Sequence, residues 1–290
     1  MADATDVKRI AVLGAGQMGG GIAQVAAQAG IDVAVFDLAD DAIDKCKALR
    51  AKLLARGVEK GKWTQDEADA ATNRISYTKN FEEMAGSDWV VEAVVENAQV
   101  KADIFKKLAK LLPDGNVVLA SNTSSISITE IATAAGDAAH RVIGMHFFNP
   151  VPVMQLVEVI RGLQTSDDVA QRTIALSERM GKTALVANDR AGFVSNRILM
   201  PMINEAFYAW MEGVAEPEAI DGVMKLGMAH PMGPLRLADF IGLDTCVHIM
   251  DVLADGLNND RYRACPLLKQ LVAAGRLGEK RGRGVFAYEK

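Results

Sequence analysis

A glycine-rich run directly after a short apolar segment constrains the fold of this chain more than any other feature. Residues Arg9 to Leu13 predict a strand, and G-A-G-Q-M-G-G-G-I-A follows at once, from Gly14 to Ala23. Gly14, Gly16 and Gly19 occupy the three positions of a G-x-G-x-x-G pattern. There the first glycine makes the strand-to-helix turn, the second admits a pyrophosphate, and the third lets the helix pack on the strand. The run predicts a dinucleotide-binding unit; the alternative is a glycine turn without a ligand.

The residues after the glycines supply the context that this pattern needs. A helix is expected from Met18 to Ala29, ending at Gly30, and a second strand from Asp32 to Phe36. Asp37 ends that strand, about 20 residues after the glycines, where an acid binds ribose hydroxyls and repels a 2′-phosphate. The predicted cofactor is therefore NAD rather than NADP.

Apolar runs alternate with helical patterns through most of the remaining chain, which favours a parallel sheet covered on both faces. Further strands are expected at Trp89–Val95, Val117–Ala120, Val142–Phe148, Met154–Ile160 and Thr183–Ala187. After residue 188 only helical spacing remains, beginning with a helix from about Phe193 to Glu212. We predict an α/β fold with two domains: a Rossmann-type, doubly wound, mostly parallel sheet over residues 1–188, and an all-helical domain over residues 189–290.

Two titratable residues lie inside apolar runs on either side of a turn. His146 belongs to the run Val142–Phe148 and Glu158 to the run Met154–Ile160, with Pro150 and Pro152 forcing a turn between them. Neighbouring strands would let the side chains meet, and the carboxylate would fix the imidazole tautomer, leaving the other nitrogen as a base. A buried histidine in a structural ion pair is the alternative.

Other polar residues follow the strands or interrupt apolar stripes. Glu96 and the hydroxyl run Ser121–Ser125 are expected beyond carboxyl strand ends, where ligands bind in such sheets. The hydroxyls could equally cap a helix at Ile126–Ala135. Asn196 lies near the apolar stripe of its helix, so it either bonds to backbone within the core or donates to a substrate carbonyl.

Composition excludes several classes of partner. The net charge of -5 argues against nucleic acid, and no apolar run is long enough to cross a membrane. Three cysteines without metal spacing indicate a reducing cytoplasm and no metal site. Lysines and arginines are concentrated between Asp44 and Lys62, where they either meet an anionic substrate or form a solvated helix face.

Several motifs, in this order along essentially the whole chain, resemble the 3-hydroxyacyl-CoA dehydrogenase family in its bacterial single-function form. They are the glycine run, V-E-A-V-V-E-N, S-N-T-S-S, G-M-H-F-F-N-P-V-P-V-M-Q-L-V-E-V, A-G-F-V-S-N-R and H-P-M-G-P-L-R-L-A-D-F-I-G-L-D. The resemblance implies NAD-dependent interconversion of (S)-3-hydroxyacyl-CoA and 3-oxoacyl-CoA, with a short acyl chain, in a cytoplasmic homodimer.

The resemblance also implies a role for each site residue. His146 is the base, oriented by Glu158, and Ser124 and Asn196 bond the substrate oxygens. NAD lies over Gly14–Gly19, including Gln17 and Met18, with Asp37 on the ribose. Its nicotinamide side meets Glu96, Lys101, Ser124 and Asn149. Lys60 matches a position that contacts CoA, and Lys280 one that reaches the cofactor. Val285-Phe286 replaces the family's usual closing aromatic pair.

Three other functions compete with this interpretation. A 3-hydroxyisobutyrate-type dehydrogenase would use a lysine base in place of His146. An L-gulonate dehydrogenase of the same family would act on a sugar acid without CoA. A non-catalytic dinucleotide-binding protein would lack a residue of the catalytic set, and His146, Glu158, Ser124 and Asn196 are all present.

Overall fold

The chain divides into two compact units, one up to Asp189 and one from Arg190. A computed structural model describes residues 6–288. The boundary expected after residue 188 lies one residue from this division. Each unit has its own apolar core, so each is described by itself.

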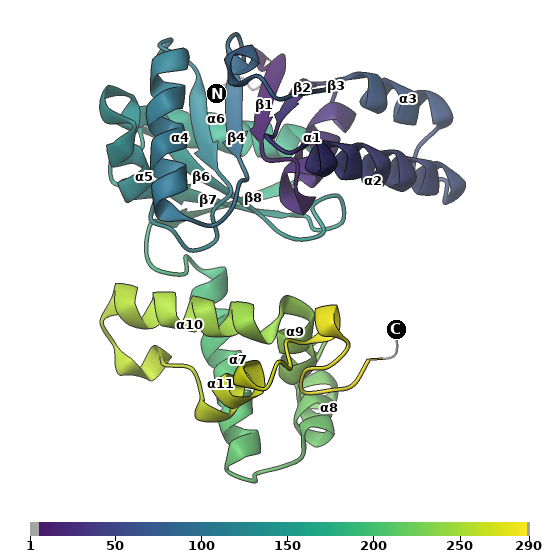
Figure 1. Ribbon diagram of the computed structural model, residues 1–290, viewed down its shortest axis with the longest axis vertical. Helices are drawn as coiled ribbons and strands as arrows, with labels where there is room; N and C mark the ends of the chain where they lie inside the picture. The colour runs from purple at the N-terminus through teal and green to yellow at the C-terminus, as the bar shows by residue number, and fades with distance from the viewer. Residues whose placement is uncertain (1–5, 289–290) are drawn as a thin grey trace. The chain divides into compact units, whose positions relative to one another are not determined.

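The first unit is built around one eight-stranded sheet (Figure 1), in the order β3-β2-β1-β4-β5-β6-β7-β8. All neighbours are parallel except β6 and β7. The strands are β1 (Arg9–Leu13), β2 (Asp32–Phe36), β3 (Ile75–Thr78), β4 (Trp89–Glu92), β5 (Val118–Ser121), β6 (Val142–Phe147), β7 (Leu156–Arg161) and β8 (Thr183–Asn188). The prediction of a mostly parallel, doubly wound sheet is confirmed.

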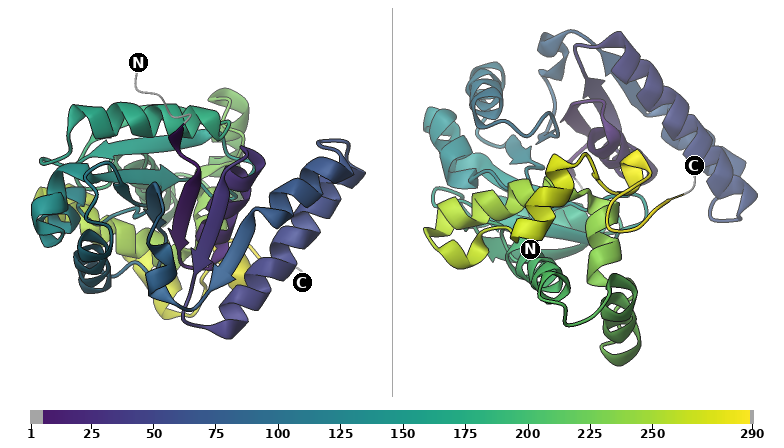
Figure 2. Two further views of the ribbon diagram at one scale, coloured as in Figure 1. Left: turned by 90° about the horizontal axis from the view of Figure 1, so that it is seen from above. Right: turned by 60° about the horizontal axis from the view of Figure 1, so that its bottom comes forward.

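Helices cover both faces of this sheet. Figure 2 shows α6 on one side of the sheet and α4 and α5 on the other. The helices of this unit are α1 (Gln17–Gln28), α2 (Asp40–Glu59), α3 (Gln65–Asn73), α4 (Ala98–Leu111), α5 (Ile128–Ala134) and α6 (Asp167–Arg179), with short 3-10 turns η2 (Phe81–Met84) and η3 (Gly136–Arg141). Apolar residues of α1, α6 and the central strands form one core. The central strands β1, β4, β5 and β6 are near-continuous apolar runs because both of their faces are buried.

Besides the 3-10 turns, one strand and one α-helix of this unit have no counterpart among the predicted elements. Strand β3 is short and partly exposed at the sheet edge, and alternating polar residues in I-S-Y-T weaken its apolar signal. Helix α6 begins after Ser166, whose side chain accepts a hydrogen bond from the Val169 amide. That Ser-Asp-Asp start is a typical cap signal, so the helix was recognisable from sequence.

The second unit is helical, as predicted. It contains α7 (Ser195–Met211), α8 (Pro217–Gly227), α9 (Pro234–Ile241), α10 (Leu243–Leu257), η4 (Asp260–Tyr262), α11 (Pro266–Ala273) and η5 (Glu279–Arg281). Helix α7 starts two residues later than expected because Phe193 has a positive φ of 48° and is not helical. Buried Asp239 accepts from the amides of Val285 and Phe286. This carboxylate therefore fixes the backbone at Val285-Phe286, where the sequence departs from the family's usual aromatic pair and left the packing unpredicted.

Candidate active site

The three fingerprint glycines differ sharply in the space around them. Gly14 has φ +104°, and a Cβ there would lie 2.5 Å from the Ala93 carbonyl oxygen. A Cβ on Gly19 would lie 1.9 Å from the Gly14 carbonyl oxygen. Gly16 is the N-cap of α1, has no side-chain cap, and would meet nothing within 4 Å. Gly14 and Gly19 therefore close the turn, while Gly16 leaves the N–H groups at the start of the helix open to an anion.

Asp37 follows β2 and turns its carboxylate toward this loop. One oxygen accepts from the Ala15 amide at 2.8 Å and the other from the Ala39 amide at 3.0 Å. Each oxygen keeps a further lone pair for a ribose hydroxyl. The open glycine at a helix N-terminus and the adjacent carboxylate fit the pyrophosphate and ribose of NAD.

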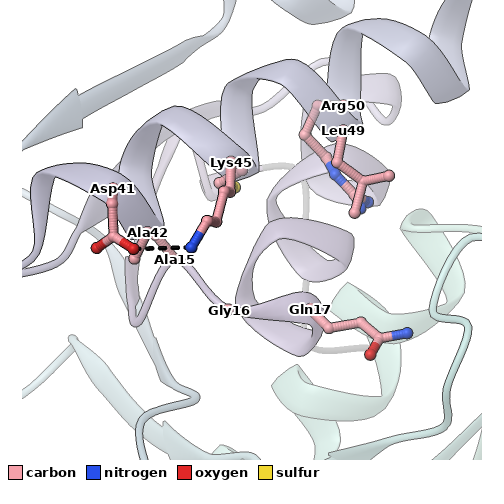
Figure 3. Close-up of a pocket in the computed structure, with 9 residues that line it drawn as sticks. Ala15, Gly16, Gln17, Asp41, Ala42, Lys45, Leu49 and Arg50 are labelled. Carbon is pink, nitrogen blue, oxygen red and sulfur yellow. Dashed lines mark hydrogen bonds and ion pairs between the residues drawn. The ribbon is translucent and has the colours of Figure 1, made fainter. Parts of the chain in front are cut away.

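A cavity of about 490 Å³ lies beside the glycine loop, between the start of α1 and the first half of α2. Figure 3 shows Gln17 from α1 and Lys45 and Arg50 from α2 around it, with Lys45 paired to Asp41 at 2.8 Å. Met18 instead packs against the apolar core. Lys60 lies at the exposed C-terminal end of α2 and does not line this cavity.

His146 and Glu158 meet across the one antiparallel strand pair of the sheet. They are directly opposite in register, and His146 Nδ1 lies 2.8 Å from Glu158 Oε2. Both side chains are almost wholly buried, His146 at 8% and Glu158 at 3% exposure. A carboxylate at Nδ1 fixes the imidazole tautomer, so Nε2 is the nitrogen suited to proton transfer.

Glu96 organises the loop that carries Ser124. Its Oε1 accepts from the Thr123 hydroxyl at 2.6 Å and from the amides of Ser124 at 2.9 Å and Ser125 at 3.1 Å. Burial opposes ionisation, but Lys101 and these hydrogen bonds outweigh it and hold the pKa of Glu96 below its usual value. The hydroxyl run therefore donates hydrogen bonds to Glu96. Ser127, outside that run, caps α5 by accepting from the Glu130 amide.

Lys101 lies deeper than a direct cofactor contact requires. Its side chain is 1% exposed, and Nζ lies 2.6 Å from Glu92 and 3.3 Å from Glu96. In this arrangement its ammonium holds Glu96 in place. Asn149, in the turn after β6, accepts a hydrogen bond from Gln17 Nε2 at 2.8 Å, which links that turn to the glycine loop.

Two predicted site residues belong to the second unit. Asn196 is the second residue of α7 and is 8% exposed. Lys280, in η5, pairs with Asp244 at 2.6 Å. Burial opposes ionisation of Asp244, but the Lys280 hydrogen bond and charge hold the pKa of that carboxyl below its usual value.

Three residues that support the site were missed. Glu92 is wholly buried and ends β4 three residues earlier than predicted, because its carboxylate turns back to accept from the Val94 amide. Lys182 is buried and donates to the Met154 carbonyl at 2.8 Å, bracing the turn after β6, and burial lowers its pKa. Asn122 accepts from the Phe147 amide at 2.9 Å. A charge inside an apolar run was the available signal for Glu92, whereas no sequence pattern marked Lys182.

Over residues 6–288, no group of three or more His, Cys, Asp or Glu side chains could hold a metal ion. Among the helices of that range, none has both the length and the apolar character of a membrane span.

A glycine loop at the carboxyl edge of a doubly wound sheet, with a buried His-Glu pair at the same edge, defines a dinucleotide-dependent dehydrogenase. The description "3-hydroxyacyl-CoA dehydrogenase, NAD binding domain" matches residues 9–190, and the C-terminal domain of the same enzyme family matches residues 192–288. The chain belongs to the 3-hydroxyacyl-CoA dehydrogenase family, and its cofactor is NAD.

Similar proteins agree over nearly the full length. A probable 3-hydroxybutyryl-CoA dehydrogenase from Deinococcus radiodurans is 58% identical, across 97% of this chain and 100% of that protein. A 3-hydroxybutyryl-CoA dehydrogenase from Bradyrhizobium diazoefficiens is 49% identical, across 97% and 96%. The crystal structure of an (S)-3-hydroxybutyryl-CoA dehydrogenase from Ralstonia eutropha superposes with a TM-score of 0.95 at 47% identity, covering 98% of this chain and 100% of that one.

Proposed function

We propose that this protein interconverts (S)-3-hydroxybutyryl-CoA and acetoacetyl-CoA with NAD. The observation that carries the proposal is the buried contact of 2.8 Å between His146 and Glu158, at the sheet edge where the glycine loop opens. Similar proteins named 3-hydroxybutyryl-CoA dehydrogenase support the short acyl chain.

His146 acts as the general base in the oxidation. Its Nε2 takes the proton from the substrate 3-hydroxyl and returns it in the reverse direction. Glu158 accepts from Nδ1–H and stabilises the imidazolium that forms, since a charge-assisted bond is stronger than a neutral one. Bound NAD would supply the acceptor for the hydride that leaves C3 of the substrate. No acid or base other than His146 is needed for this step.

The remaining site residues bind and orient. Ser124 and Asn196 bond the substrate oxygens, and Glu96 and Asn149 meet the nicotinamide side. Lys101 acts on the cofactor through Glu96, because its ammonium is buried between two carboxylates. Asp37 binds the adenosine ribose. Lys60 is assigned to CoA and Lys280 to the cofactor.

The second domain, residues 189–290, binds substrate and forms a homodimer in the cytoplasm. The apolar side chains that this unit leaves exposed support a partner subunit: Val214, Val223, Leu226, Met228 and Phe240 are all at least half exposed. Val223 and Leu226 lie three residues apart on α8 and therefore share one face of that helix. An exposed apolar face supports an interaction surface there.

Substrate oxidation assays test the proposal against L-gulonate dehydrogenase activity. With NAD present, (S)-3-hydroxybutyryl-CoA should be oxidised rapidly and L-gulonate slowly or not at all. Free 3-hydroxybutyrate serves as the control for the CoA moiety. Faster oxidation of L-gulonate than of the thioester would replace the proposed substrate while leaving the roles of His146 and Glu158 intact.

A further inference from the structure

A chain of buried charges runs from the end of β4 to the Ser124 loop. Glu92 is wholly buried, and its Oε1 accepts from Lys101 Nζ at 2.6 Å and from the Val94 amide at 2.7 Å. Its Oε2 accepts from the Ser121 hydroxyl at 2.6 Å. Lys101 then reaches Glu96 at 3.3 Å. Every partner of Glu92 therefore belongs to the loop, the helix or the strand end that builds the nicotinamide side of the site.

The two carboxylates make different uses of Lys101. The contact to Glu92 is short and inaccessible to water, whereas Glu96 is 30% exposed at its side chain. The ammonium is anchored on Glu92 and contacts Glu96 at Oε2. That leaves Oε1 of Glu96 to the Thr123, Ser124 and Ser125 donors.

A purely structural role explains this arrangement poorly. Buried ion pairs are expensive to desolvate, and apolar residues of similar volume often stabilise a fold as well or better. Two carboxylates sharing one lysine cost more than a simple pair, because one negative charge stays unbalanced. Glu96, the carboxylate that shares Lys101 with Glu92, is the one that holds the loop.

We propose that Glu92 is a positioning residue of the dehydrogenase: through Lys101 and Ser121 it fixes Glu96 and the Ser124 loop where cofactor and substrate bind. The inference rests on the proposed function for what Ser124 and Glu96 contact. Glu92 itself touches neither ligand.

The test compares Glu92→Gln with Asp88→Asn. Asp88 directly precedes β4, and Glu92 is the last residue of that strand. Asp88 accepts from the amides of Lys8 and Arg9, at the end of the strand away from the site. Both variants lose a carboxylate that braces the same strand. NADH affinity is measured by fluorescence titration, and melting temperature is measured alongside.

Glu92→Gln should weaken NADH binding and lower kcat/KM for the thioester by about 10- to 100-fold, the scale for a displaced binding group. Asp88→Asn should lower the melting temperature and leave NADH affinity and kcat/KM within twofold of wild type. Unchanged NADH affinity and kcat/KM in Glu92→Gln, or equal losses in Asp88→Asn, would overturn the proposal.

A milder variant covers the case in which Glu92→Gln does not fold. Ser121→Ala removes one hydrogen bond to Glu92 at 2.6 Å and the longer one that the Ser121 hydroxyl accepts from the Thr123 amide at 3.2 Å. NADH affinity should fall in the same direction by a smaller factor. Wild-type affinity in a folded Ser121→Ala would also count against the proposal. NADH titration needs no substrate, so this test stands even if wild type fails to oxidise 3-hydroxybutyryl-CoA and the proposed function falls.

Discussion

Replacing Glu158 by glutamine isolates the charge of the carboxylate that faces His146. Glutamine has nearly the same shape, so the strand pair β6–β7 should keep its register. The substitution removes the negative charge of Glu158, whose Oε2 lies 2.8 Å from His146 Nδ1 in the wild type. The neutral imidazole keeps a hydrogen-bond partner, whereas the imidazolium formed during oxidation loses its counter-charge.

The size of the effect follows from the burial of the pair. A hydrogen bond to a charged group contributes about 1.5–3 kcal/mol, and burial of both side chains leaves little water to replace it. Each 1.36 kcal/mol is tenfold in rate, so turnover should fall about 10- to 150-fold. NADH affinity should stay near wild type, because Glu158 contributes to the chemical step alone.

The assay is steady-state NADH oxidation with acetoacetyl-CoA, and the control is Thr165→Val. Thr165 is buried and donates to the Val142 carbonyl at 2.6 Å, at the opposite end of β6 from His146. Thr165→Val should destabilise the fold without changing turnover. Turnover of Glu158→Gln within twofold of wild type, in a folded protein, would refute the assigned role of the pair.

Three further outcomes are expected. Gly19→Ala should lower the free energy of unfolding by about 1–3 kcal/mol, because its Cβ would overpack against the Gly14 carbonyl. Gly16→Ala faces open space, so it should keep its melting temperature and bind NADH more weakly. The reverse pattern in thermal melts and NADH titrations would contradict the geometry of the loop. Because the folded-state pKa of Glu96 is lowered from 4.5, its contribution to stability is present above that pH and is lost as pH falls through the folded pKa. Denaturant unfolding at about pH 5 and about pH 3 should therefore show a smaller acid loss in Glu96→Gln than in wild type, and an equal loss would be contrary to this expectation. Burial, with Asp244 and Asp239 nearby, raises the pKa of the Cys246 thiol to about 12, so the native protein should resist thiol reagents at neutral pH; rapid labelling of Cys246, located by peptide mass, would argue against it.

The sheet and the His-Glu pair were predictable because local signals and tertiary structure agree there. Strongly apolar runs made the central strands recognisable, and two prolines required the turn that makes β6 and β7 antiparallel. With that turn, His146 and Glu158 could meet only if the register was right, and the structure confirms the contact.

The ionic network behind Glu96 was not predictable, because no local pattern encodes it. Glu92 lies in an apolar run and could be taken as part of a longer strand, and Lys101 is one of several lysines on an amphipathic helix. Their pairing depends on how β4 and α4 pack, which is a tertiary property. The resemblance implied that Lys101 contacts the cofactor, and the structure shows its ammonium between Glu92 and Glu96.

Reduction of acetoacetyl-CoA by NADH in wild type and in His146→Gln tests the central claim most directly. Wild type should oxidise NADH rapidly with the thioester, slowly with free acetoacetate, and much more slowly with NADPH in place of NADH. His146→Gln should lose about two to four orders of magnitude in turnover, the scale for removing a general acid or base, while still binding NADH. Comparable turnover in the variant would contradict the role of His146 as the proton-transfer group.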